Sequence, residues 1–523
     1  MDLKVSLSKL NQYTLPFQKL PDTSPAKFEK TPKEDTFEMS IGYVNDIHGQ
    51  TNNMMRILSG IKGDLRLSAG DNDIGDEKNQ AVHKATTEFL NIAGIKASAL
   101  GNHEFDTKQN DFINTVKHFK GDVLTANFNK ELVKNQNKDE VQEQGRADLD
   151  KYIKKSSIVD VKGEKIGLIG ASPVDMFERA THPDYHKDCT VDDLEDTIED
   201  IQEEIDDLKE QGINKIVLLS HLGYKRDRVV AQNTQGIDVI VGGHTHELIK
   251  DIKEGENLLY SQNGEPVIIT EAGRDGRAFG LLNLTFDKNG VIKKAQNNLA
   301  ETSLFYRNLI NQYLFDDILG KPERIGYVKK ASMPPTTLIE ENPHANFMCD
   351  AMRYELGTDI AVWNNAGPRN FFHEGVIDSR DVRDIAPFRD GVSVADVSEE
   401  KIVNWFEDII ERSYKSPGYK PGLVAVSGLN YTVDSRLGKL AGMSFVDKEG
   451  NEHKIDIDNP DKDKTYKIAA DSFMMSAGAD LGVLAPKEEC IEYKECKDYF
   501  TCEYIKHLDK PIEINQTGRI KFV

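Results

Sequence analysis

Residues 38–49 read EMSIGYVNDIHG, an apolar run that ends in the polar motif Asp46-Ile47-His48-Gly49. Similar short runs follow it along the chain: DLRLSAG (64–70), KASALG (96–101), KIGLIGAS (165–172), KIVLLSH (215–221) and IDVIVGG (237–243). Each run has the length and the aliphatic content of a buried strand, and helical patterns separate them. Strands that alternate with helices predict an α/β layered fold.

Five of these runs end in polar motifs that contain metal-binding residue types. In chain order the motifs are Asp46-Ile47-His48-Gly49, Gly70-Asp71-Asn72, Gly101-Asn102-His103-Glu104, Ser220-His221 and Gly242-Gly243-His244-Thr245-His246. In an α/β sheet, the segments beyond the carboxyl ends of the strands converge on one crevice. The motifs therefore predict a single site that combines two Asp, one Asn and five His.

This combination of side chains predicts a dinuclear metal centre. Neutral imidazoles and carboxylates are the ligands that borderline divalent ions prefer, and Asp46 and Asp71 supply compensating negative charge. Zn²⁺, Mn²⁺ and Fe all accept this mixture of ligands. The residues therefore predict two divalent ions and leave their identity open.

The length of the chain, 523 residues, predicts more than one domain. Residues 1–37 are polar and interrupted by prolines, which predicts an extended N-terminal arm. We expect a metal-binding domain at 38–298, a linker helix at 299–324 and a second α/β domain at 325–523. The strands expected in this second domain are IAVWNN (360–365), GLVAVSGLNYTV (422–433), TYKIAA (465–470) and GRIKFV (518–523).

The charge of the chain argues against polyanionic partners. Asp and Glu number 88 against 66 Lys and Arg, which gives a net charge of −22 that repels nucleic acid and anionic membranes. No apolar run is long enough for a membrane span or a signal peptide, so we expect a cytoplasmic protein, or an exported one if a leader has been removed. The oligomeric state stays open, and we assign no role to Cys490, Cys496 or Cys502.

The motifs DIHG, GDN, GNHEFD, SH and GHTH resemble those of the calcineurin-like metallophosphoesterases. Together with NNAGPR (364–369) and Ala-Pro-Phe (386–388), they resemble the two-domain 5′-nucleotidase and UDP-sugar hydrolase family within that group. The resemblance covers about residues 38–523. It implies a four-layer α/β/β/α metallophosphoesterase sandwich, followed by a linker helix and a C-terminal α/β 5′-nucleotidase domain.

The resemblance also implies a role for each residue of the metal site. One ion is held by Asp46, His48 and His246, the other by Asn102, His221 and His244, and Asp71 bridges the two. His246 stands where the family often has Gln, and imidazole is an equally competent ligand. A hydroxide that bridges the ions is expected to attack phosphorus, while His103, oriented by Asp106, stabilises the phosphoryl oxygens and the leaving group.

In the C-terminal segment the resemblance implies a nucleotide-binding site. Its residues are Asn364, Gly367, Arg369, Phe388, Phe473 and Asp480. Arg369 offers a planar fork for an anionic group, and Phe388 offers a face on which a base can stack. Ala479 and Leu481 replace family glycines and Arg389 follows Phe388, so we expect a reshaped nucleoside pocket.

These observations favour a dimetal phosphohydrolase that cleaves phosphate monoesters of nucleotides, a 5′-nucleotidase of nucleotide catabolism. A UDP-sugar hydrolase and a 2′,3′-cyclic nucleotide phosphodiesterase are alternatives with the same chemistry. A protein that binds metal and nucleotide without catalysis is an alternative of another class. In each case the expected partner is a small-molecule nucleotide, and the family implies that the domains rotate about the linker helix.

Overall fold

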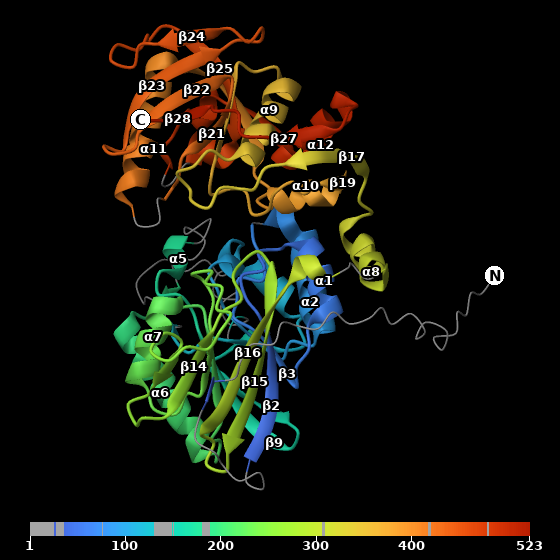
Figure 1. The fold of residues 1–523 in the computed structure, drawn as a ribbon, viewed down its shortest axis with the longest axis vertical. Helices are drawn as coiled ribbons and strands as arrows, with labels where there is room; N and C mark the ends of the chain where they lie inside the picture. The colour runs from blue at the N-terminus through green and yellow to red at the C-terminus, as the bar shows by residue number, and fades with distance from the viewer. Residues whose placement is uncertain are drawn as a thin grey trace, which may run out of the picture.

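The computed structural model has two lobes that meet at a junction (Figure 1). It describes residues 26–27, 36–75, 77–129, 149, 151–179, 189–305, 309–416, 420–477 and 481–523. Of the predicted arm at 1–37, only residues 26–27 and 36–37 are described, and both pairs are in strands. No helix in these ranges is long and apolar enough to cross a membrane.

The N-terminal lobe contains two β-sheets. The first has the strand order β1 (Ala26–Lys27), β16 (Ile292–Glu301), β15 (Ala278–Asp287), β2 (Thr36–Val44), β3 (Leu65–Ser68), β4 (Ala97–Ala99), β5 (Asp122–Leu124) and β7 (Ile153–Lys154). The second has the order β13 (Leu258–Tyr260), β14 (Pro266–Thr270), β12 (Val239–Val241), β11 (Ile216–Ser220), β9 (Glu164–Ala171) and β8 (Ser156–Val161). Strands β2 to β5 are parallel, and so are β9, β11, β12 and β14.

The two sheets pack face to face. Their shared core includes Ile41 and Leu67 from the first sheet and Leu168 and Leu219 from the second, all completely buried. Helices α1 (Thr51–Gly60), α2 (Gln80–Ala93) and α8 (Leu309–Leu319) cover the outer face of the first sheet. Helices α6 (Leu194–Glu210) and α7 (Tyr224–Asn233) cover that of the second. The predicted four-layer α/β/β/α sandwich is confirmed, with α3 (Gln109–Val116), α5 (Met176–Arg179) and the pair β6 (Phe128–Asn129) and β10 (Thr190–Val191) beside it.

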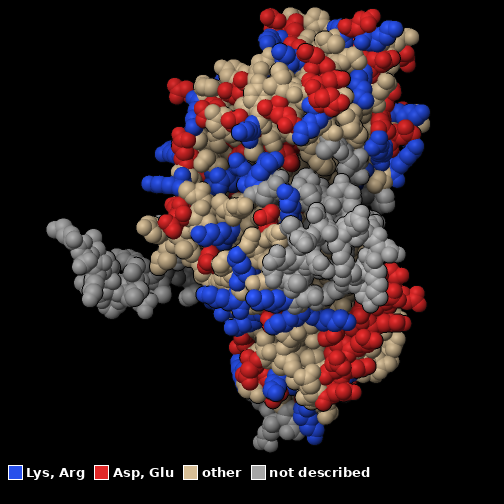
Figure 2. Space-filling model, turned by 180° about the vertical axis from the view of Figure 1, so that it is seen from behind, with Lys and Arg blue, Asp and Glu red and all other residues tan. Residues whose placement is uncertain are grey.

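Helix α6 shows how the sequence pattern becomes a layer. Ile201, Ile205 and Leu208 recur at helical spacing and are buried against the second sheet. The Asp193 side chain begins the helix by accepting the backbone N–H groups of Glu195 and Asp196. The opposite face is acidic, and Figure 2 shows acidic side chains gathered on this side of the N-terminal lobe. The acidic helix is therefore a structural layer with a solvated face.

The C-terminal lobe is also α/β, as predicted. Its largest sheet has the order β21 (Val424–Ser427), β18 (Ile360–Asn364), β25 (Thr465–Asp471), β20 (Gly391–Ser398) and β26 (Ile491–Cys496). The others are β24 (Glu452–Ile455), β23 (Lys439–Val446), β22 (Leu429–Asp434) and β28 (Ile520–Phe522), and β19 (Gly375–Asp378), β17 (Arg324–Ala331) and β27 (Ile512–Ile514). Helices α9 (Pro343–Leu356), α10 (Ser379–Ile385), α11 (Glu399–Lys415) and α12 (Lys497–Leu508) complete the lobe.

Helix α8 lies within the predicted linker and contacts both lobes. Phe315 is buried against α1 and α2, and Asp316 forms an ion pair of 2.8 Å with Arg380 of α10. Residues 299–301 of the predicted linker helix belong to β16 and residues 302–304 form a single 3₁₀ turn, and α8 is described from Leu309. It ends before Gly320, whose φ of 81° is left-handed. The exact domain division remains a prediction.

Candidate metal centre

The five predicted motifs meet at one end of the two sheets. The first three follow β2, β3 and β4, which are neighbours in the first sheet, and the other two lie at the ends of β11 and β12, neighbours in the second. Three overlapping groups of possible metal ligands result: Asp46, His48 and His246; His48, Asp71 and His103; and Asp46, Asp71 and His221. The convergence predicted from the strand ends is therefore present.

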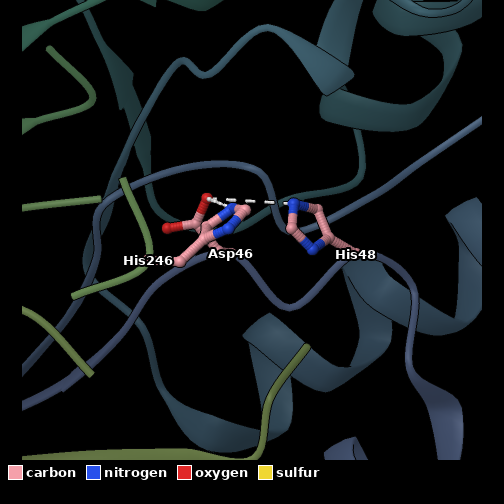
Figure 3. Close-up of side chains that lie close together, drawn as sticks. All are labelled: Asp46, His48 and His246. Atoms are coloured by element: carbon pink, nitrogen blue, oxygen red, sulfur yellow. Dashed lines mark ion pairs between the residues drawn. The ribbon is translucent and has the colours of Figure 1, made fainter. Parts of the chain in front are cut away.

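One predicted ligand set is compact. Oδ1 of Asp46 lies 3.3 Å from Nε2 of His246 and 3.8 Å from Nε2 of His48, and Figure 3 shows the three side chains turned toward one another. Two ligand atoms bound to one ion at about 2.1 Å lie roughly 3.0 to 3.4 Å apart. These donors therefore need only small shifts to hold an ion.

The second set is formed by donors on the other side of Asp71. Oδ2 of Asp71 lies 3.1 Å from Nε2 of His221. Nδ1 of His244 lies 3.1 Å from Oδ1 of Asn102, the spacing of two ligands of one ion. The same Asp71 oxygen is 3.5 Å from Nε2 of His48. Asp71 thus lies between the two sets, the position that a bridging carboxylate requires.

The histidine tautomers fit metal binding. Nδ1 of His221 donates to the carbonyl of Ala69 at 2.6 Å, and Nδ1 of His48 donates to a carboxylate oxygen of Asp275 at 3.0 Å. Each ring therefore presents Nε2 to the metal site, and this is the atom that can coordinate an ion once it carries no proton. Both Nε2 atoms are buried and make no hydrogen bond with the described residues, which is the state expected of atoms that await a metal ion.

The backbone at the site is held in an unusual conformation. Eight non-glycine residues of the described ranges have positive φ, and five of them are predicted metal ligands: Asp46, His48, Asp71, His244 and His246, at φ values of 48° to 75°. Such conformations cost on the order of 1–3 kcal/mol each and cluster at functional sites. The loops are therefore shaped for the positions of these side chains.

Charges within the site keep its carboxylates ionised. Burial by itself would raise the pKa of Asp46 and Asp71, but His221 and other imidazoles outweigh this effect and lower both values. Burial would likewise lower the pKa of His221, yet Asp71 and Asp46 raise it to about 10. Cations would take the place of these protons, since the site contains the negative charge that two divalent ions need.

Two supporting residues were missed by the sequence analysis. The partly buried carboxylate of Glu104 accepts the backbone N–H groups of Asp71, Asn72 and Gly101 at 2.8 to 3.0 Å, and loss of solvation together with Asp71 raises its pKa to about 7. Nδ2 of Asn45 donates to Oδ2 of Asp46 at 2.7 Å. Asn45 directly precedes the predicted ligand Asp46, and Glu104 directly follows the predicted dyad residue His103, so adjacency to a candidate site residue was the available signal.

The predicted catalytic dyad forms a direct contact. Nδ1 of His103 donates to Oδ2 of Asp106 at 2.7 Å, and the same oxygen accepts the N–H of Gly75 at 2.9 Å. The backbone N–H of His103 donates to Oδ1 of Asp71 at 2.9 Å. The dyad is thus hydrogen-bonded to Asp71, the predicted bridging carboxylate. Because Nδ1 of His103 contacts Asp106, Nε2 is the ring atom that would act on a bound phosphoryl group.

The predicted substrate residues fall into two groups. Phe388 lies against the metal site, with its ring centroid 6.1 Å from that of His103, and the Arg369 guanidinium lies 5.3 Å from the Phe388 centroid. Phe473 packs on the C-terminal core, and no ring contact joins it to Phe388 in the described ranges. Asp480 lies outside the described residues.

The turn that carries Arg369 is closely packed. The N–H of Gly367 donates to the carbonyl of Asn364 at 3.1 Å, and the N–H of Asn364 contacts Sδ of Met474 at 3.0 Å. A Cβ on Gly367 would lie 2.6 Å from Nε1 of Trp363, so a larger residue does not fit. The functional roles of Asn364, Gly367, Arg369, Phe388 and Phe473 remain predictions.

Comparison with known families gives a match for each lobe. The model of the calcineurin-like phosphoesterase family matches residues 39–248, and that of the 5′-nucleotidase C-terminal domain matches residues 324–485. The matched regions contain every predicted metal ligand and both predicted dyad residues. They are separated by residues 249–323, which include β13, β14, the hairpin of β15 and β16, and α8.

Individual proteins show the same likeness. A trifunctional nucleotide phosphoesterase of Bacillus subtilis is 27% identical over 94% of this chain and 35% of its own length. A probable 5′-nucleotidase of Treponema pallidum is 27% identical over 71% of this chain and 70% of its own length. The chain thus spans about a third of the first relative. The crystal structure of a 5′-nucleotidase precursor from Thermus thermophilus shares the fold, with a TM-score of 0.68, 22% identity and coverage of 93% of this chain and 99% of that one.

Proposed function

Because the chain belongs to the calcineurin-like phosphoesterases that carry a 5′-nucleotidase C-terminal domain, we propose that it hydrolyses nucleoside 5′-monophosphates to nucleosides and phosphate. The observation that carries the proposal is the position of the Asp71 carboxylate between His48 and His221, at 3.5 and 3.1 Å. Proteins of this family use two divalent ions, and the paired donor sets fit that number. When bound, such ions activate water and neutralise charge on a phosphoryl group.

The protein's own side chains supply the remaining chemistry. His103, held through Nδ1 by Asp106, directs Nε2 toward the phosphoryl group and donates a proton from that atom to the departing ribose oxygen. Arg369 pairs with an anionic oxygen of the substrate. Phe388, which contacts both Arg369 and His103, stacks on the base. Both lobes thus act on one substrate.

Other nucleotide esters are candidates for the same site. The Bacillus subtilis relative is named as trifunctional, which supports testing more than one class of nucleotide phosphoester. UDP-glucose and a 2′,3′-cyclic nucleotide represent the two alternative substrate classes. A protein that binds without catalysis would need no proton donor, so the His103–Asp106 contact of 2.7 Å favours an enzyme.

A substrate panel tests the proposal. AMP, UDP-glucose and a 2′,3′-cyclic nucleotide are offered to the protein after chelation and again after addition of Mn²⁺. We expect AMP hydrolysis to be lost with the metal and restored with it, at a rate above those of the other two substrates. Turnover of UDP-glucose or of the cyclic nucleotide alone would replace the 5′-nucleotidase assignment, and no turnover of any of them would favour a binding protein.

A further inference from the structure

Asp275 lies behind the metal centre, although its sequence position gives no hint of it. The residue follows β14 in the segment EAGRDGR (271–277), 227 residues beyond His48. Its side chain is completely buried, and Oδ1 accepts the Nδ1 proton of His48 at 3.0 Å. A carboxylate can only accept here, so the contact fixes the tautomer in which Nε2 of His48 is unprotonated. That Nε2, like the one of His221, is buried and makes no hydrogen bond with the described residues.

The backbone of Asp275 has the same unusual conformation as the backbone of the predicted ligands. Its φ is 57°, which makes it one of the eight non-glycine residues with positive φ in the part of the chain that the structure describes, beside the five predicted ligands. Its N–H donates to the carbonyl of Asp46 at 2.6 Å, and its own carbonyl accepts Nδ2 of Asn53 at 2.8 Å. This left-handed conformation of an aspartate has a free-energy cost, which the two backbone hydrogen bonds help to offset. The side chain is therefore held in one position relative to His48 and Asp46.

Two arginines balance the buried charge of Asp275. Nε of Arg274 lies 3.2 Å from Oδ2, and a terminal nitrogen of Arg277 lies 3.3 Å from the same oxygen. A buried carboxylate without such partners would carry a large desolvation cost. The two arginine side chains are about two-fifths exposed, so each can remain partly solvated while it neutralises Asp275.

Arg277 extends the chain of contacts into the C-terminal lobe. Its terminal nitrogen donates to the backbone carbonyl of Arg369 at 3.1 Å, and its guanidinium lies 5.6 Å from the ring centroid of Phe371. A continuous path therefore runs from His48 through Asp275 and Arg277 to the turn that carries Arg369. Each step of the path is a hydrogen bond or an ion pair.

We propose that Asp275 is a positioning residue of the metal centre, which orients His48 for its ion and, through Arg277, sets the place of the Arg369 turn. The proposal rests on the metal centre of the proposed function and is independent of its substrate. A carboxylate that holds a metal-binding histidine typically changes metal affinity by roughly 10- to 100-fold when it is removed. Arg277 acts one step further out, so we expect a smaller effect from its loss.

The test is calorimetric titration of Mn²⁺ into metal-free protein. Asp275→Asn removes the charge and keeps the shape, and Asp251→Asn, at an exposed position of the same lobe, is the matched control. We expect Asp275→Asn to weaken Mn²⁺ binding by roughly 10-fold or more, and Asp251→Asn to leave it unchanged. The melting temperature of each metal-free protein is measured alongside, because a merely structural role would lower that temperature without changing the affinity of the folded protein.

Arg277→Gln is the second variant, and it keeps the test decisive if Asp275→Asn does not fold. We expect it to weaken Mn²⁺ binding by a few-fold and to raise the KM for AMP while kcat changes less. Wild-type affinity in either folded variant would overturn the proposal. Failure of the wild-type protein to bind Mn²⁺ would instead overturn the metal centre itself, so the two outcomes are distinguishable.

Discussion

The ring of Phe388 lies 6.1 Å from that of His103, so a C-terminal aromatic residue contacts the predicted catalytic histidine of the N-terminal lobe. Arg369 covers the Phe388 ring at 5.3 Å. The two lobes are therefore close enough for one substrate to touch the metal donors and the C-terminal residues together. A base that stacks on Phe388 would displace the Arg369 guanidinium from part of the ring.

Removal of the Phe388 ring separates a stacking role from a packing role. We expect Phe388→Ala to raise the KM for AMP by roughly 10-fold, since stacking of one base on an aromatic ring contributes about 1–3 kcal/mol. Ribose 5-phosphate has the same sugar and ester without the base, so its KM is expected to stay within about twofold of wild type by the same reasoning. Equal losses with both substrates in steady-state assays would show that Phe388 supports the fold and does not stack.

Loss of His103 tests the assigned proton donor. We expect His103→Ala to lower kcat for AMP by roughly 100-fold or more, because general acid catalysis by a histidine contributes about that factor. Bound Mn²⁺ should remain at the wild-type level, and the exposed His118→Ala serves as a control. A His103→Ala protein with near-normal kcat would remove the dyad from the mechanism.

Asp384 of α10 caps α1 across the junction. The Thr51 hydroxyl donates to Oδ1 of Asp384 at 3.1 Å and the N–H of Asn52 donates to Oδ2 at 3.0 Å, while Gln50 at the helix start makes no side-chain cap. We expect Asp384→Ala to lower stability by about 1 kcal/mol, the typical loss of a cap, and to increase the radius of gyration in small-angle scattering.

Asp193→Ala is the matched comparison, because Asp193 caps α6 within a single lobe. It should cost a similar free energy of unfolding and leave the radius of gyration unchanged. If the two variants gave the same scattering curve, the cap across the junction would have no part in holding the lobes together.

The buried His344 predicts a pH dependence of stability. Nε2 donates to the carbonyl of Ser332 at 2.9 Å and Nδ1 accepts the N–H of Phe372 at 3.1 Å, and burial lowers the pKa of the ring to about 4. The folded state thus favours the neutral ring, whose stabilisation is complete above the unfolded pKa of about 6.5 and is lost as pH falls toward 4.

Comparison with His344→Gln, which cannot titrate, isolates this effect. Between pH 7 and pH 4 we expect the free energy of unfolding of the wild-type protein to fall by about 3 kcal/mol more than that of the variant. Denaturant titrations at several pH values measure the difference. Parallel pH profiles of the two proteins would mean that His344 accepts a proton without loss of stability.

Much of the fold and the donor set could be predicted from the sequence because both depend on short local patterns. Aliphatic runs such as 38–44 and 215–220 form strands, and the polar residues that follow them lie at the strand ends. Within each sheet the carboxyl ends of the parallel strands share one edge, and the packing of the two sheets then brings Asp46 and His221 together.

Other residues that could not be predicted from the sequence depend on contacts that no local pattern contains. Asp275 reaches His48 because β14 and β15 return the chain to the first sheet, and Asp384 reaches α1 only when the lobes are together. The boundaries of helices also depended on competing interactions. The acidic helix α6 begins at Leu194, because Thr190 and Val191 pair with β6 and Asp193 supplies the cap.

The most direct test of the dinuclear centre is a Mn²⁺ titration of metal-free protein in which bound ions and AMP hydrolysis are measured on the same samples. We expect two ions per chain, with activity rising as the second ion binds, and we expect Asp71→Asn to disrupt the binding of both ions. Binding of fewer than two ions by active protein, or AMP hydrolysis that continues undiminished after chelation, would contradict the arrangement of Asp71 between two metal sites.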